Sequence, residues 1–143
     1  MITRLTHTSI YVLDQNSAYD FYVNKLGFKV ITDLPMGDSG LRWLTVAPQE
    51  HPKFEINLTP IADEGMWYDK ETAATLRTLV KKGTFGCGVM TSNDIYATYE
   101  ELRAKGVEFT KPPKKEFYGL EALFKDDSGN WFSLAQLEPS TKS

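Results

Sequence analysis

Apolar and polar positions along the chain follow the same order twice. Residues 5–30 contain an apolar stretch, then apolar residues at helical spacing, then a second apolar stretch, and residues 85–109 repeat this order at a spacing of 80. In each copy an aspartate can cap the start of the helix and a glycine can end it. These residues are Asp14 and Gly27 in the first copy and Asp94 and Gly106 in the second. Each copy therefore predicts a strand, a helix and a strand.

After each of these units the pattern changes to alternation with a period of two. It predicts strands over 41–47, 53–59, 121–125 and 131–136. Residues 69–82 place apolar side chains at helical spacing and end at Gly83, so a third helix should link the halves. The sequence thus predicts an α+β fold of two tandem βαβββ modules in one domain, 1–143. The expected bounds are 3–62 for the first module, 63–84 for the linking helix, 85–137 for the second module and 138–143 for a polar tail.

Alternation gives the predicted strands two faces of different composition. One face is apolar and should pack against the helices, with Phe54, Ile56, Leu58, Phe132 and Leu134. The other mixes bulky aromatic side chains with isolated polar groups, which is typical of a ligand cleft rather than a solvated sheet. Its members are His7, Ser9, Tyr11, Trp43, Thr45, Glu55, Asn57, Cys87, Val89, Thr91, Trp131 and Ser133.

Composition and charge exclude several classes of protein. The net charge is −3 and the isoelectric point about 5.4, without the basic excess that nucleic-acid binding needs. No apolar run approaches a membrane span, and the start lacks a signal-peptide layout, so we expect a cytoplasmic protein with no membrane partner. The single cysteine, Cys87, excludes an intrachain disulfide. No nucleophile triad, phosphate loop or dinucleotide fingerprint is present.

Taken together, several short motifs make the chain resemble the vicinal oxygen chelate superfamily, which includes glyoxalases, bleomycin-resistance proteins and extradiol dioxygenases. The motifs are Leu5-Thr6-His7, Phe21-Tyr22 before Leu26-Gly27-Phe28, Asp94 seven residues beyond Cys87, Gly106-Val107, Tyr118-Gly119 and Asp126-Asp127-Ser128-Gly129-Asn130. The resemblance covers residues 3 to 136. It implies that the modules form a curved mixed sheet around a cleft. It also implies a homodimer, for which Met66, Trp67 and Tyr68 offer a contact.

The resemblance further implies four metal-ligand positions, which here hold His7, Asn57, Cys87 and Ser133. Asn57 and Ser133 are neutral, poor ligands, and Cys87 would be a strong ligand only as a thiolate. We therefore expect no bound cofactor, although a divalent metal is possible if Glu55 or Glu121 supplements the set.

Individual residues keep alternative interpretations. His7 is a ligand or a hydrogen-bonded cleft histidine, and Cys87 lines the cleft or is a small buried residue near the module interface. Glu55 is either paired or catalytic with a raised pKa. Trp43 and Trp131 are ordinary core residues or a wall for a planar ligand. The candidate binding residues are Tyr11, Trp43, Asn57, Cys87, Tyr118, Trp131 and Ser133, and the candidate catalytic residues are Glu55, His7 and Glu121.

Three functions agree with this pattern. The first is a metal-free protein, similar to bleomycin-resistance proteins, that binds a small planar or partly apolar molecule in its cleft. The second is a metal-dependent lyase, isomerase or dioxygenase of the glyoxalase I type. The third is a metal-independent lyase or isomerase that uses Glu55, Glu121 or His7 for proton transfer.

Overall fold

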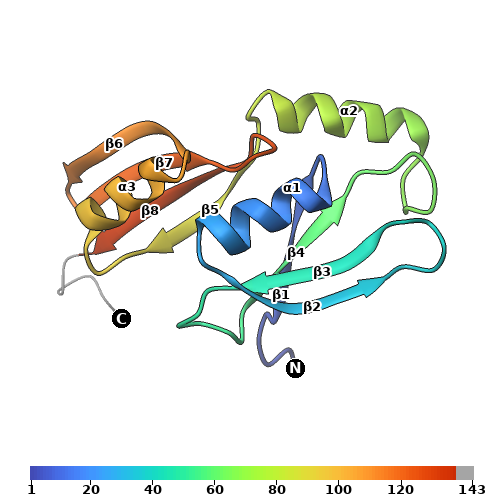
Figure 1. Ribbon diagram of the computed structural model, residues 1–143, viewed down its shortest axis with the longest axis horizontal. Helices are drawn as coiled ribbons and strands as arrows, with labels where there is room; N and C mark the ends of the chain where they lie inside the picture. Colours follow the sequence, from blue (N-terminus) through green and yellow to red (C-terminus); the bar gives the residue numbers. More distant parts are fainter. Residues whose placement is uncertain (138–143) are drawn as a thin grey trace.

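The two halves of the chain fold into modules with the same order of elements, in a computed structural model that describes residues 1–137 (Figure 1). The first module contains β1 (His7–Val12), α1 (Gln15–Tyr19), η1 (Asp20–Lys25), β2 (Lys29–Pro35), β3 (Arg42–Ala47) and β4 (Glu55–Pro60). α2 (Lys70–Lys81) follows it. The second module contains β5 (Gly86–Thr91), α3 (Ile95–Ala104), β6 (Glu108–Glu116), β7 (Gly119–Lys125) and β8 (Trp131–Leu137). The predicted α+β fold of two tandem βαβββ modules is confirmed. The predicted tail, 138–143, lies outside the described residues.

Each module has its own four-stranded mixed sheet. The strand order is β1-β4-β3-β2 in the first sheet and β5-β8-β7-β6 in the second. The first strand pairs in parallel with the last, β1 with β4 and β5 with β8, and the other pairs are antiparallel. Within residues 1–137 no strand pairing joins the two sheets.

The predicted caps explain where the helices begin. The side chain of Asp14 accepts a hydrogen bond from the Ser17 N–H, and that of Asp94 accepts one from the Ala97 N–H. Gly27 follows the first helix with φ 77°, a conformation that side chains disfavour. The second half of that helix, η1, is a π-helix, with Leu26 N–H bonded to Phe21 O at 2.9 Å. Helical spacing alone does not predict this wider turn.

The main hydrophobic core is shared by the two modules. Ile56 and Leu58 of β4 and Phe132 and Leu134 of β8 are buried in it, which confirms the predicted apolar face. Tyr22 of η1 packs edge-on against Phe132, with ring centroids 6.4 Å apart. One core therefore holds both sheets to α1, η1 and α3.

The turn between β7 and β8, residues 126–130, fastens the second module to the first. The Tyr22 hydroxyl donates to Asp126 at 2.7 Å, and Ser128 Oγ accepts the Leu13 N–H at 2.9 Å. Asn130 Nδ2 donates to the Tyr11 carbonyl at 2.8 Å. Burial and the Asp126 carboxylate raise the pKa of Tyr22 well above its usual value, so its hydroxyl keeps its proton.

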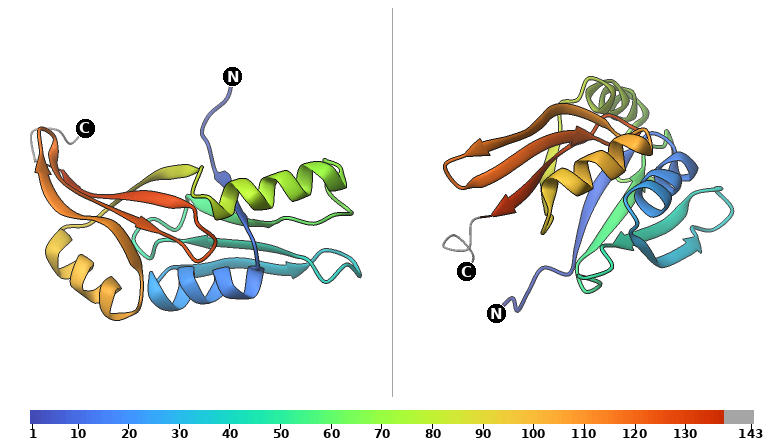
Figure 2. Two further views of the ribbon diagram at one scale, coloured as in Figure 1. Left: turned by 90° about the horizontal axis from the view of Figure 1, so that it is seen from above. Right: turned by 60° about the vertical axis from the view of Figure 1, so that its left-hand side comes forward.

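The helices lie at different places relative to the sheets. α1 and α3 lie on the same side of the two sheets, and α2 lies apart from them (Figure 2). Side chains of α2 belong to a second, small core with Tyr11, Leu13 and Phe85, at the end of β1 and the start of β5. The sheet face opposite α1 and α3 is thus left largely uncovered. Within the described part of the chain, no helix has the length and apolar character to span a membrane.

Candidate functional site

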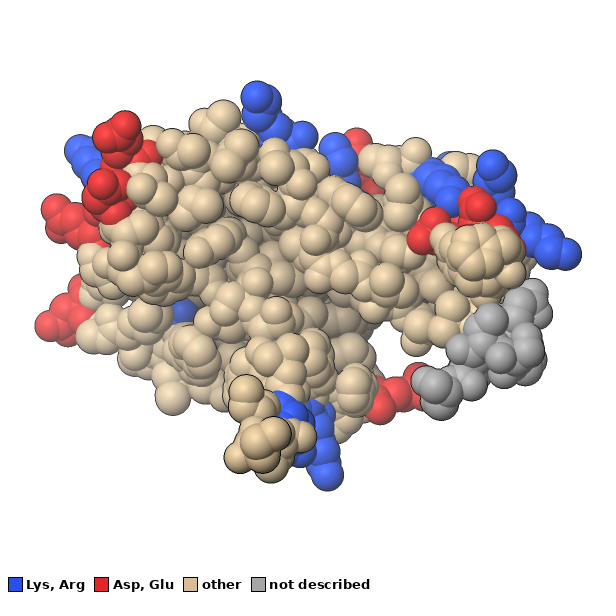
Figure 3. Space-filling model, turned by 180° about the vertical axis from the view of Figure 1, so that it is seen from behind, with Lys and Arg blue, Asp and Glu red and all other residues tan. Residues whose placement is uncertain are grey.

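The sheet face opposite α1 and α3 carries most of the residues that alternation assigned to a cleft. Seen from that side, charged side chains lie mainly around the rim and the centre is largely uncharged (Figure 3). Trp43 is 41% exposed and Trp131 37% exposed, which is unusual for side chains of this size. Both are therefore available to a ligand.

His7, Thr45 and Glu55 form the first polar cluster on this face. His7 Nε2 lies 3.0 Å from Glu55 Oε2, and the Thr45 hydroxyl donates to Glu55 Oε1 at 2.7 Å. On the other side of the imidazole, His7 Nδ1 lies 2.8 Å from Thr6 Oγ1. The Trp43 ring lies beside His7, tilted by 46° with centroids 6.4 Å apart. A paired carboxylate thus fixes an imidazole next to an exposed indole.

Asn57 lies within the same sheet and presents an acceptor without a partner. Its Cα is paired with Ser9 of β1 and Thr45 of β3, and the residue is only 7% exposed. Among the described residues no group donates to Asn57 Oδ1. A buried amide oxygen without a donor costs about 1–3 kcal/mol, which a ligand N–H or O–H could offset. Tyr11, further along β1, instead packs edge-on against Tyr68 beside α2.

The second polar cluster lies in the second module and is centred on Glu121 of β7. Ser133 Oγ donates to Glu121 Oε2 at 2.6 Å, and Lys111 Nζ donates to Glu121 Oε1 and to Glu116 at 2.9 Å each. The Ser133 hydroxyl, with further help from Lys111 and Tyr118, lowers the pKa of Glu121. The hydrogen bond that the Tyr118 hydroxyl donates to Glu121 raises the pKa of Tyr118. At neutral pH the carboxylate is therefore ionised and the phenol is protonated.

The Glu121 network predicts a pH-dependent contribution to stability. A carboxyl group whose pKa is lower in the folded state stabilises the fold above its unfolded pKa, and this contribution is lost as the pH falls through the folded pKa. We expect Glu121→Gln to cost about 1 kcal/mol at pH 7, because the network is partly exposed. Urea unfolding of both proteins between pH 7 and pH 3 measures the difference, which should shrink below about pH 4.5. A difference that stays constant would contradict the network.

Cys87 is not placed on this face, contrary to the alternation pattern. The register between β5 and β8 shifts between Gly86 and Gly88, so Cys87 sits in a bulge. Its side chain is partly buried and packs against the main core instead. Burial, with Asp126 nearby, raises the pKa of the thiol to about 11. Trp131 keeps its predicted face, and its indole covers Gly86, where an added Cβ would lie 2.3 Å from the ring.

The structure brings the predicted residues together only in part. His7, Glu55 and Trp43 form one group, and Glu121, Ser133 and Tyr118 form another. Within residues 1–137, no hydrogen bond or ion pair joins these two clusters. Sequence reasoning missed Lys111, Glu116 and Thr6. Lys111 precedes two prolines in a strand with an irregular register, so alternation gave no signal for its direction.

The side chains at the four positions that the resemblance assigned to metal ligands do not fit a metal ion. His7 is engaged by Glu55, Ser133 by Glu121, and the Cys87 thiol is protonated and packed against the core. Within the described range, no three His, Cys, Asp or Glu side chains are placed to share one ion. A divalent ion needs three or four converging donors, and residues 1–137 offer no such set.

Comparisons with known proteins agree with this architecture. A family model described as the Glyoxalase/Bleomycin resistance protein/Dioxygenase superfamily matches residues 4–134. The crystal structure of UcmS2 is similar with a TM-score of 0.87 and 49% identity, covering 94% of this chain and 98% of that one. TnmS3, an antibiotic binding protein from Streptomyces sp. CB03234, is similar with a TM-score of 0.72 and 28% identity, over 96% and 98% of the two chains. The uncharacterized protein YetH of Bacillus subtilis (strain 168) is 32% identical over 95% of this chain and all of its own length.

Proposed function

Because the chain belongs to the glyoxalase/bleomycin resistance protein/dioxygenase superfamily, we propose that it binds a small planar or partly apolar molecule on the sheet face opposite α1 and α3, without a metal ion. The observation that carries this proposal is the pairing of two features on one face. The Trp43 indole is exposed, and on the adjacent strand, β4, a buried Asn57 acceptor has no described donor. An aromatic surface with a few placed polar groups is typical of a small-molecule site.

The comparison with TnmS3 supports this class of ligand. TnmS3 is described as an antibiotic binding protein, and it is similar to this chain over almost the full length of both. The proposal for this chain is therefore binding of an antibiotic-like molecule that carries an aromatic plane and at least one N–H or O–H group. The plane would lie against Trp43, and a shift of neighbouring side chains would open Asn57 Oδ1, which is buried in the free protein, to the donor.

Equilibrium dialysis against a panel of planar antibiotics tests this function. Mass spectrometry of the recovered ligand separates capture from catalysis, because a binding protein returns the molecule unchanged. We expect at least one aromatic member of the panel to be retained intact with micromolar affinity or better. Retention of none would contradict the proposal.

The pair formed by His7 and Glu55 favours a second candidate, a metal-independent lyase or isomerase. Glu55 Oε2 contacts His7 Nε2, and the Thr45 hydroxyl donates a hydrogen bond to Glu55 Oε1. These contacts orient the imidazole beside the Trp43 ring. An oriented imidazole can act as a general acid or base toward a bound molecule. Conversion of a ligand in the dialysis, lost in His7→Gln and retained in His51→Gln, would favour this enzyme over a binding protein.

A chelator should leave the stability of the purified protein unchanged. A structural metal contributes binding free energy to folding, whereas the donors found here would hold an ion weakly at best. The melting temperature measured with and without excess EDTA should agree within about 1 °C. A fall of many degrees would show that a bound metal holds the fold together.

We also propose that the protein is a homodimer, as expected from the family resemblance. Trp67 is 72% exposed and stacks edge-on against Tyr68, which leaves an aromatic surface just before α2. Sedimentation velocity at micromolar concentration should show a species of about twice the 16.2 kDa chain mass. A single species at the monomer mass would contradict this proposal.

A further inference from the structure

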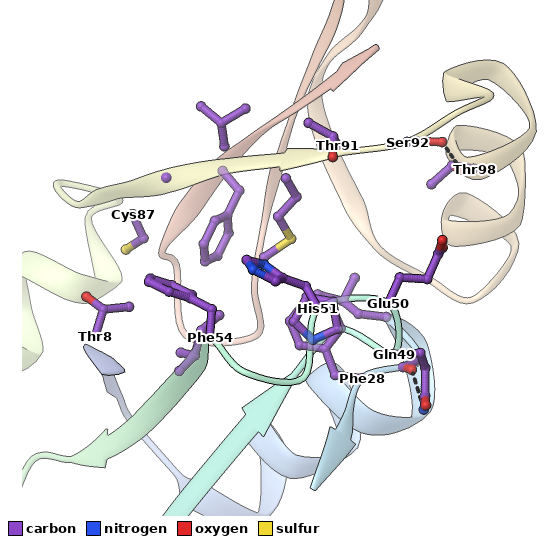
Figure 4. Close-up of a pocket in the computed structure, with 18 of the residues that line it drawn as sticks. Thr8, Phe28, Gln49, Glu50, His51, Phe54, Cys87, Thr91, Ser92 and Thr98 are labelled. Atoms are coloured by element: carbon purple, nitrogen blue, oxygen red, sulfur yellow. Dashed lines mark hydrogen bonds between the residues drawn. The ribbon is translucent and has the colours of Figure 1, made fainter. Parts of the chain in front are cut away.

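A cavity of about 950 Å³ lies between the two modules, on the same side of the sheets as α1 and α3. Thr8, Ile10 and Ile56 line it from the first module, and Cys87 and Met90 line it from the second. Thr8, Phe54 and Cys87 converge at one end, while Gln49, Glu50 and Ser92 lie toward the other (Figure 4). The proposed site with Trp43 lies on the opposite face of the sheets, so the two places are separate.

The internal repeat explains why this space is open. In the second module, turn 126–130 docks on Tyr11, Leu13 and Tyr22 of the first module. At the repeat spacing of 80, the corresponding partners for turn 48–54 are Thr91, Asn93 and Leu102. Thr91 and Asn93 line the cavity instead. Among the described residues, no hydrogen bond or ion pair joins turn 48–54 to the second module.

Residue chemistry accounts for the difference between the two turns. Asp126 follows β7 and accepts three backbone N–H groups of its own turn together with the Tyr22 hydroxyl. Pro48 occupies the same place after β3 and has no side-chain acceptor, and Leu102 has no hydroxyl to donate. The only described bonds of turn 48–54 stay within the first module, including Gln49 Nε2 to Gly27 O at 3.2 Å. Turn 48–54 therefore lacks the side-chain hydrogen bonds to the second module that would close the space between them.

The lining restricts the chemistry of a guest. No Lys or Arg lines the cavity, whereas Glu50 and Asp94 do, so anions are disfavoured. Burial keeps the Cys87 thiol neutral, since its pKa is raised to about 11. The walls mix polar groups with apolar and aromatic side chains, among them the stacked rings of His51 and Phe54 at 6.0 Å, and Thr8 and Ser92 add hydroxyl groups. The volume falls in the range of sites for drug-sized ligands.

We propose that this inter-module cavity is a second binding site, for an uncharged, partly aromatic small molecule. The guest occupies the space between the modules that corresponds, through the internal repeat, to the place where turn 126–130 docks. Its rings lie among Phe54, Ile56 and Met90, and a polar group meets the hydroxyl of Thr8. The inference does not depend on the site at Trp43.

Cys87 provides a direct readout, because it is the only cysteine of the chain and lines the cavity. N-phenyl-1-naphthylamine serves as an uncharged aromatic probe whose emission rises in apolar surroundings. At a probe concentration about ten times its Kd, alkylation of Cys87 by N-ethylmaleimide should slow about tenfold, because only the unoccupied fraction reacts. Thr8→Phe should place a ring at the end of the cavity beside Cys87, and so weaken probe binding and reduce protection. Thr8→Ser, which keeps the hydroxyl and adds no bulk, should preserve both.

Trp43→Ala separates the two sites, because it removes the aromatic surface on the other face and should leave protection of Cys87 intact. If Thr8→Phe fails to fold, protection of Cys87 in the natural protein decides alone. Probe binding without protection of Cys87, no probe binding, or full protection in Thr8→Phe would each overturn the proposal. These results would mean that no guest binds in the cavity, and that water or a shifted turn 48–54 occupies it instead.

Discussion

Replacing Phe132 with alanine should lower the free energy of unfolding by about 3–5 kcal/mol, the usual cost of removing a buried phenylalanine. Phe132 is 2% exposed, its ring stacks on Phe124 at 5.5 Å, and Tyr22 meets it edge-on. The substitution thus removes contacts between the modules as well as within the second sheet. One flank of the ring borders the inter-module cavity, which places the expected loss toward the lower end of the range.

Urea unfolding at pH 7 measures this loss, and Phe117→Ala is the matched control. Phe117 is 97% exposed in the turn between β6 and β7, so the same truncation there should change stability by less than about 0.5 kcal/mol. A loss below about 1 kcal/mol for Phe132→Ala would mean that the apolar face has been assigned to the wrong side of β8.

Trp43→Ala should weaken ligand binding by about 1–3 kcal/mol, or about 5- to 150-fold in Kd, while changing stability little. The indole is 41% exposed and makes no described hydrogen bond. We therefore expect it to provide a stacking surface for the ligand and to contribute little to the stability of the fold. Trp43→Phe should recover part of the affinity because a smaller ring still stacks. Quenching of tryptophan emission during titration with a retained antibiotic gives the Kd for each variant.

Tyr96→Ala is the control for Trp43→Ala, since it removes an aromatic side chain that is 55% exposed on α3, on the other side of the sheets. It should leave the affinity unchanged. Equal losses of affinity in both variants, or unfolding caused by Trp43→Ala, would contradict the proposal that the face with His7, Glu55 and Asn57 is the binding site.

The overall fold could be predicted because its signals are local and occur twice. Asp14 and Asp94 cap helices as their positions in the repeat indicated, and Gly27 takes a positive φ. The face assignment also followed from alternation, since Phe132 is buried while Trp131 is 37% exposed. Such features depend on the nearest few residues, which a sequence shows directly.

Features that depend on irregular backbone could not be predicted in the same way. The bulge at Cys87 reversed one side chain, and only the glycines on either side of it, Gly86 and Gly88, hinted at an interruption. The π-helical turn at η1 and the contact of Lys111 with Glu121 likewise arise from packing and register shifts. The sequence also gave no sign of the cavity, because it results from a missing contact between distant segments.

The position of the bound ligand decides whether the sheet face with Trp43 is the binding site. The three tryptophans give separate indole N–H signals in ¹H–¹⁵N NMR spectra, and each reports on a different surface. Trp43 and Trp131 lie on the proposed face, whereas Trp67 lies in the segment before α2. Saturation with an antibiotic retained in the dialysis should shift the signals of Trp43 and Trp131 and leave that of Trp67 in place. A shift confined to Trp67, or no indole shift at saturation, would contradict the account.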